Sequence, residues 1–184
     1  MVKFSVHTIE SAPAGSRETL TTVRQNLGGI PNLAAAMAES PSLVKGFFGL
    51  RSIYLGGTFS EADTQVLSLA NAMANRCEWC VSFHSVFAIK AGVTPETVEA
   101  LRDGRLPTEP RFRALSKFTQ AMIEARGRVS DKETEEFLSA GFTKAQALEV
   151  IVGIAFSTMA NYTEHLGRPP LDSMLESQKF LAVY

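Results

Sequence analysis

Helix-start signals recur along the chain and divide it into short segments. Each signal is a Ser or Thr suited to cap a helix, followed either by Pro at the first helical position or by an acidic or amide side chain three residues later. They are Ser40-Pro41, Ser60 with Asp63, Thr94-Pro95-Glu96, Ser130 with Glu133, and Thr143 with Gln146. No segment alternates apolar and polar residues over a useful length, and no Asn-Gly hairpin signal occurs. The predicted fold class is therefore all-α.

Apolar residues between these signals repeat at helical spacing, and Gly or Pro closes most segments. We expect an irregular lead-in over residues 1–15 and an irregular tail from Pro169 with one short turn. The helix that ends near Leu166 is apolar nearly all round from Leu148 to Met159, so it should be central. The expected helices cover about 16–27, 33–39, 41–55, 60–74, 76–90, 95–103, 112–126, 131–140 and 144–166.

Composition indicates one globular domain over residues 1–184, with its core at about 16–166. Of the 184 residues, 45% are hydrophobic and 20% are charged, which is enough to build a substantial core. The formal net charge of -1 gives no electrostatic footprint for nucleic acid or an anionic membrane, so neither partner is expected. The chain shows neither a signal-peptide pattern nor an apolar run of roughly 20 residues, and we expect a cytoplasmic protein.

The reactive side chains are concentrated in Cys77-x-x-Cys80-x-x-x-His84, which holds both cysteines and one of the three histidines. At helical pitch these three side chains share one face. In a reducing compartment a close cysteine pair indicates catalysis or metal binding more often than structural cross-linking. The cluster is therefore the candidate site.

A break in the helix before this cluster determines its predicted geometry. An unbroken helix over 60–90 would be about 45 Å long, which is long for a domain of this size. Asn75 with Glu78 three residues later resembles an N-cap with a capping box. We therefore expect an antiparallel hairpin of helices 60–74 and 76–90.

This hairpin gives the site side chains specific neighbours. Counting equal distances from the turn places Gln65 opposite His84 or Ser85. Cys77 would lie in the first helical turn, where free backbone N–H groups favour the thiolate. Cys80 would have His84 one turn away as a base or hydrogen-bond partner.

Three interpretations of the cluster remain open. The cysteines could be small buried residues beside a hydrogen-bonded histidine. They could bind zinc with His84, but His165 or a carboxylate would then have to supply the fourth ligand. We favour the third, a redox dithiol, because two thiols and a proton carrier satisfy its needs locally. No cofactor or metal is expected.

Other aromatic and histidine side chains are given structural roles. Trp79, Phe83 and Phe87 form a row on the same helix, and core packing explains it better than an apolar wall for an organic substrate. His7 and His165 are expected to be structural or exposed, although His165 could reach the site from the last helix.

The residues now described resemble the alkylhydroperoxidase AhpD-like, or carboxymuconolactone decarboxylase, superfamily. The central motif lies in Gln65 to Gly92 and is followed by Val93-Thr94-Pro95-Glu96. The likeness extends outward to Gly28-Gly29-Ile30-Pro31-Asn32, Ser40-Pro41, Gly127-Arg128-Val129-Ser130-Asp131 and Asn161-Tyr162.

The resemblance implies an all-helical fold around a hairpin, assembled as a homotrimer or a hexamer. It also implies a peroxidase in which Cys80 attacks an organic hydroperoxide and becomes a sulfenic acid. Cys77 would resolve it as a disulfide, and His84 would belong to a proton relay. A dithiol reductant or a lipoyl-bearing adaptor protein would restore the thiols.

Two positions depart from the peroxidase pattern. Gln65 stands where that pattern has a glutamate, and a glutamine cannot accept a proton. Trp79 stands where the pattern can carry a second histidine. Glu61, Glu78 or an acid from the last helix is a candidate replacement for the base.

The sequence therefore predicts an enzyme, a thiol-dependent peroxidase or disulfide oxidoreductase. One alternative is a non-catalytic redox-sensing or binding subunit. Another is a carboxymuconolactone decarboxylase-type enzyme that does not use the thiols, although the presence of both cysteines favours thiol chemistry.

Overall fold

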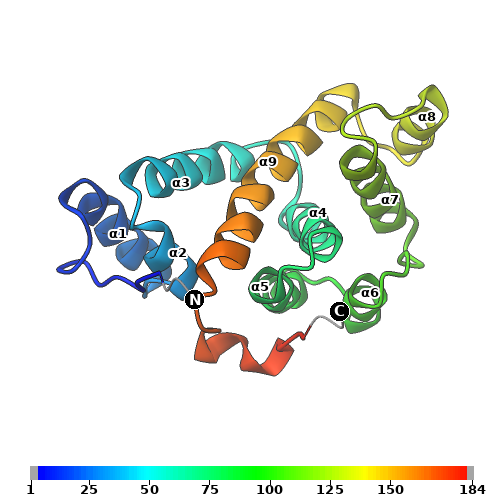
Figure 1. Cartoon of the computed structure of the whole chain (residues 1–184). Helices are drawn as coiled ribbons and strands as arrows, with labels where there is room; N and C mark the ends of the chain where they lie inside the picture. The colour runs from blue at the N-terminus through cyan, green and yellow to red at the C-terminus, as the bar shows by residue number, and fades with distance from the viewer. Residues whose placement is uncertain (1–3, 182–184) are drawn as a thin grey trace.

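The regular elements of the described residues are all helices, as predicted (Figure 1). A computed structural model describes residues 4–181, and no strand occurs within that range. The outermost residues of the expected lead-in and tail, 1–3 and 182–184, lie outside it. The helices are α1 (Ala14–Leu27), α2 (Asn32–Met37), α3 (Pro41–Leu55), α4 (Glu61–Ala74), α5 (Glu78–Lys90), α6 (Pro95–Arg102), α7 (Pro110–Glu124), α8 (Asp131–Ser139), α9 (Lys144–Gly167) and the 3-10 helix η1 (Ser173–Gln178).

The helices pack around α4 and α9. Helix α9 runs between α3 and α4, while α5 and α7 pack against α4 (Figure 1). Val66, Leu67 and Leu69 of α4 are completely buried. The tail forms η1, which packs against α5. No single helix within residues 4–181 is long and apolar enough to cross a membrane. Helices α8 and α9 together have the length and composition of a membrane span, but the pair is bent by 107°.

Capping boxes begin the helices where the sequence predicts them. Ser60 with Asp63 starts α4, Ser130 with Glu133 starts α8, and Thr143 starts α9. In each box the Ser or Thr side chain accepts the backbone N–H of the residue three positions later. The acidic or amide side chain of that later residue accepts the backbone N–H of the Ser or Thr. The carboxylate of Asp63 also binds Arg111 of α7, with distances of 2.8 and 3.0 Å, and thereby links α4 to α7.

The turn between α4 and α5 corrects one prediction. Asn75 does not begin the second helix; it is the C-cap of α4, and its backbone N–H bonds to the Asn71 carbonyl. Arg76 adopts a left-handed conformation (φ 54°), and the Cys77 N–H bonds to the Ala72 carbonyl, which makes a Schellman motif. Asparagine is common at both ends of helices, so the residue type alone does not show which helix Asn75 caps. Helix α5 therefore begins at Glu78, two residues later than expected.

Candidate functional site

The two cysteines are joined by a disulfide at the start of α5. Cys77 is the N-cap of this helix, and its Sγ accepts the backbone N–H of Cys80 at 3.2 Å. Both residues are buried, with exposures of 0% and 1%. The Cys80 N–H of the first turn points at the Cys77 sulfur, so a thiolate formed on Cys77 would be stabilised.

His84 is held against Gln65 across the hairpin. Its Nδ1 lies 2.9 Å from Gln65 Oε1, which confirms the predicted juxtaposition of the two helices. Because an amide oxygen can only accept a hydrogen bond, Nδ1 carries the proton. The neutral ring then keeps a lone pair on Nε2, which has no hydrogen-bond partner among residues 4–181.

Burial strongly affects the acidity of this imidazole. It lowers the pKa of His84 to about 3, since the charged ring would lose its water and no carboxylate faces it. His84 is therefore neutral at physiological pH. It can hold a proton only briefly, and it returns that proton readily.

The candidate relay acids are divided between two places. Glu61 is exposed and lines the same cavity as His84, whereas Glu78 is half-buried in the first turn of α5. Glu164 supplies an acid from the last helix: burial raises its pKa, and the charge of Glu78 adds to the effect. His165 is exposed and lies 3.6 Å from Glu164, so the structure places it on the surface of α9, not against the cysteines.

A cavity of about 730 Å³ reaches His84 and Gln65. Residues of α3, α4, α5 and α9 line it, and Phe83 and Phe87 form part of its apolar wall. Neither cysteine lines the cavity, but Cys80 lies one helical turn from His84 on the same helix. A volume of this size is within the range of small-molecule sites.

Trp79 lies outside the cavity lining. It stacks on Phe83, with ring centroids 5.0 Å apart, and Phe83 in turn packs on Phe87. The indole N–H donates to Asp172 at 2.9 Å, and Asp172 also accepts the backbone N–H of Asn32. Trp79 thus supports the wall from behind, as the core-packing interpretation expects.

The cavity also contains residues that were not identified from the sequence. Arg51 of α3 and Asp172 of the tail are two of them. Neither belongs to a local motif, and Asp172 lies 93 residues from Trp79, so only the tertiary fold brings them to the site.

The zinc alternative gains no support from the geometry. No group of three or more His, Cys, Asp or Glu side chains within the described range is placed to hold a metal ion.

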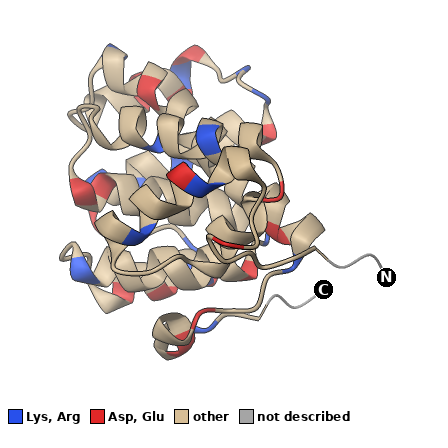
Figure 2. Cartoon of the chain, turned by 90° about the vertical axis from the view of Figure 1, so that its left-hand side faces the viewer, with Lys and Arg blue, Asp and Glu red and all other residues tan. Residues whose placement is uncertain are grey.

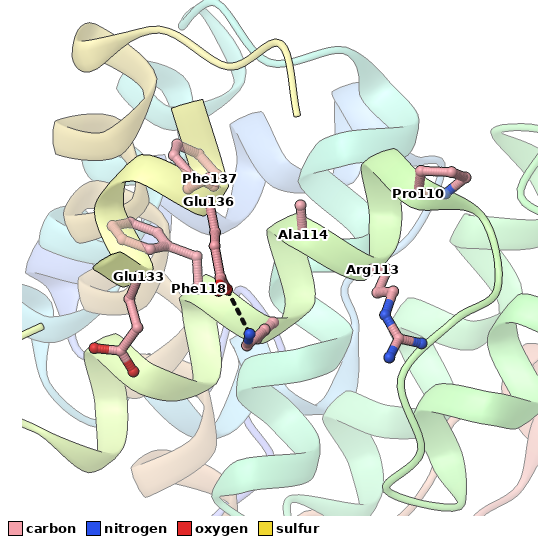
Figure 3. A pocket seen from close by; sticks show the side chains of 8 residues that line it. Pro110, Arg113, Ala114, Phe118, Glu133, Glu136 and Phe137 are labelled. Atoms are coloured by element: carbon pink, nitrogen blue, oxygen red, sulfur yellow. Dashed lines mark hydrogen bonds and ion pairs between the residues drawn. The ribbon is translucent and has the colours of Figure 1, made fainter. Parts of the chain in front are cut away.

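A second cavity lies away from this cluster, between α7 and α8 (Figure 3). It measures about 200 Å³, and the ion pair between Lys117 and Glu136 crosses it. None of the predicted site residues lines it. Its lining contains this ion pair and the rings of Phe118 and Phe137 but no nucleophile, so the candidate site is the cavity at His84.

Solved structures with the same arrangement are known. One is the alkylhydroperoxidase AhpD core of an uncharacterized peroxidase-related protein from Ralstonia eutropha JMP134 (TM-score 0.82, 20% identity, 94% of this chain and 93% of that chain). Another is an uncharacterized peroxidase-related protein from Silicibacter sp. TM1040 (TM-score 0.78, 16% identity, 96% of this chain and 94% of that chain). A third is a cysteine-to-alanine variant of the debrominase Bmp8 in complex with 2,3,4-tribromopyrrole (TM-score 0.77, 16% identity, 97% of this chain and 95% of that chain).

The chain shares its all-helical fold with these AhpD-like structures. Residues 41–121, which include α3 to α6 and the cysteine pair, match the carboxymuconolactone decarboxylase family. This match covers less than half of the chain, and together with the shared fold it makes the protein similar to the AhpD-like/carboxymuconolactone decarboxylase superfamily. No curated protein matches the sequence.

Proposed function

We propose that this protein is a thiol-dependent peroxidase that reduces organic hydroperoxides through the Cys77/Cys80 pair. The observation that carries the proposal is the disulfide at the start of α5, with the Gln65-bound His84 one turn beyond Cys80. The disulfide is the product that the oxidative half of a thiol peroxidase reaction would form, and the folded chain accommodates it.

The proposed reaction has two covalent steps. The Cys80 thiol gives its proton to Nε2 of His84, and the thiolate attacks the outer peroxide oxygen. The O–O bond breaks, Cys80 becomes a sulfenic acid, and the alkoxide takes the proton from His84 to leave as an alcohol. The Cys77 thiol then attacks the Cys80 sulfur, which releases water and forms the disulfide.

A reductant must close the cycle. Two electrons and two protons from a dithiol reductant, or from a lipoyl-bearing adaptor protein, would regenerate both thiols. A reducing, cytoplasmic setting and a homo-oligomeric assembly, a trimer or hexamer, belong to the same proposal.

The test uses the reduced protein in a stopped-flow assay with cumene hydroperoxide. We expect wild type to consume the peroxide faster than a free thiol does, and Cys80→Ser to abolish this consumption. Cys77→Ser should retain a single turnover and leave a sulfenic acid that a dimedone probe traps. Undiminished turnover in both variants would contradict the proposal.

The other interpretations predict different results. A redox-sensing subunit would show no turnover but would change its assembly with the state of the disulfide. A decarboxylase-type enzyme would keep its activity without either thiol. The debrominase Bmp8 has the same fold, so fold alone does not determine the reaction, and the thiol variants provide the discriminating test.

A further inference from the structure

The cavity at His84 contains a cation with no counter-ion. Arg51 projects from α3 and is half-buried, and it has no hydrogen bond or ion pair within residues 4–181. Burial lowers the pKa of its guanidinium, although arginine still remains charged at neutral pH. Burying part of a charged group without a partner costs free energy, and an anionic ligand that pairs with the guanidinium would reduce this cost.

The acidic side chains of the cavity do not neutralise this charge. Asp172 accepts the indole N–H of Trp79 and the backbone N–H of Asn32. Glu61 is exposed at the first residue of α4 and forms no ion pair with Arg51. A second cation, Lys90, lies 4.9 Å from the centre of the Phe87 ring.

The remaining walls are apolar and extend to the proposed reaction centre. Phe83, Phe87 and Phe156 line the same cavity as Gln65 and His84. A ligand that complements this lining has an apolar body, which aromatic side chains hold, and an anionic group for the guanidinium. Arginine recognises carboxylates especially well because its planar fork can form two parallel hydrogen bonds.

We propose that Arg51 is a specificity residue and that the preferred substrate is an organic hydroperoxide that carries a carboxylate. This inference rests on the proposed function for the reacting group, but the carboxylate subsite itself is independent of the thiol chemistry. The carboxylate binds Arg51, the hydrocarbon body lies against the phenylalanines, and the peroxide group faces the His84 end of the cavity.

Binding of an unreactive ligand pair tests the subsite. The probes are 4-isopropylbenzoate and its neutral isostere 4-isopropylbenzamide, titrated by calorimetry into the oxidised protein. Fluorescence of Trp79, the only tryptophan, gives a second readout because its ring stacks on Phe83. We expect the wild-type protein to bind the carboxylate about tenfold or more tightly than the amide, as a charge-assisted pair allows.

Matched variants assign this preference to Arg51. Arg51→Gln should reduce the ratio of the two dissociation constants to about one, and Arg51→Lys should retain part of it, since a lysine keeps the charge without the fork. The control is Arg105→Gln, which removes an exposed arginine paired with Asp103 and should keep the wild-type ratio. Circular dichroism checks that each variant is folded, and Arg51→Lys provides the ratio if Arg51→Gln fails to fold.

Two outcomes would overturn the inference: equal wild-type affinity for both probes, or an unchanged ratio in folded Arg51 variants. Failure of the peroxidase proposal gives a different result, because carboxylate selectivity would persist while no hydroperoxide is consumed. If both proposals hold, kcat/KM for a cumene hydroperoxide with a para-carboxylate should exceed that of its para-carboxamide by a similar factor.

Discussion

Gln65 determines the chemical character of His84. Its amide oxygen fixes the proton on Nδ1 and leaves Nε2 free, so it orients the ring as a carboxylate would. It adds no negative charge, however, and nothing offsets the effect of burial on the imidazole. Orientation is retained while basicity is lost.

Restoring the carboxylate should therefore increase reactivity. In Gln65→Glu the new charge lies beside Nδ1 and raises the pKa of His84, which makes Nε2 a stronger base. We expect thiol oxidation by cumene hydroperoxide at pH 7 to accelerate roughly 10- to 100-fold, in line with general-base contributions. The matched control is Gln65→Ala, which leaves Nδ1 unpartnered and should be slower than wild type. Equal rates for wild type and Gln65→Glu would show that the base lies elsewhere, for example at Glu61.

The low pKa of His84 also predicts how stability depends on pH. The unfolded chain binds a proton on this histidine near its ordinary pKa of about 6.5, whereas the folded protein does so only near pH 3. Between these values the unfolded state holds more protons, so the free energy of unfolding falls as the pH is lowered. From pH 7 to pH 5 this group should account for a loss of about 2 kcal/mol. Urea titrations at both pH values measure the loss, and a folded His84→Gln variant should lack this contribution.

At the scale of elements, Asp63 has two structural roles. It completes the capping box of α4 and binds the Arg111 guanidinium of α7 through both carboxylate oxygens. Burial raises the pKa of this carboxyl, but the hydrogen bonds from Arg111 and Ser60 outweigh that effect and hold the pKa below its usual value. The charge of Asp63 is thus needed where the two helices meet.

Asp63→Asn should destabilise the protein because it leaves Arg111 without its counter-ion. We expect a loss of about 2 kcal/mol in the free energy of unfolding, less than for a fully buried pair because Arg111 is 38% exposed. The control is Asp103→Asn, which breaks an exposed pair with Arg105 and should cost less than about 0.5 kcal/mol. Guanidinium denaturation of both variants makes the comparison, and similar small losses would contradict the assigned role.

The helix boundaries show which features a sequence can predict. Capping boxes use neighbours three residues apart, so Ser60, Ser130 and Thr143 revealed their helices without tertiary information. The break at Asn75 was predicted, but Asn75 was assigned to the start of the second helix instead of the end of the first. The left-handed residue that ends α4 is Arg76, and arginine seldom adopts this conformation. The cysteine hairpin was likewise predictable from local spacing.

The lining of the cavity was less accessible to sequence reasoning. Phe83 and Phe87 share a helix with the cysteines, and helical periodicity placed them in one row with Trp79, but core packing was the favoured explanation of that row. Arg51 and Asp172 come from other parts of the chain, and neither has a distinctive local pattern. Their place in the site is a consequence of packing, and only the folded chain reveals it.

For the whole molecule, the outer side of α9 exposes a stripe of large apolar side chains. Leu148, Ile151, Tyr162 and Leu166 repeat at helical spacing and remain exposed by 49% to 69%. The sequence indicated a central helix, and α9 does contact α3 and α4, yet this stripe stays open. Basic and acidic residues are interspersed along the chain and do not gather in one area (Figure 2).

This stripe gives the predicted homo-oligomer a testable interface. Ile151→Glu places a charge within it and should shift the protein toward a monomer, since burying an unpaired carboxylate is unfavourable. Light scattering coupled to size-exclusion chromatography measures the mass of each species. Lys132→Glu on α8 serves as a surface control and should leave the mass unchanged. A monomeric wild-type protein would contradict the prediction.

Asp172 joins distant parts of the chain, with consequences for biosynthesis. It binds Asn32 and Trp79, and nearby Phe180 donates its backbone N–H to Ser82 on α5, the helix of Trp79. Because Asp172 follows Trp79 by 93 residues, it is translated about 5 to 20 s later at ordinary elongation rates. During this interval the nascent cysteine helix lacks its C-terminal cover. The thiols of Cys77 and Cys80 therefore meet the redox environment of the cell before the protein around them is complete.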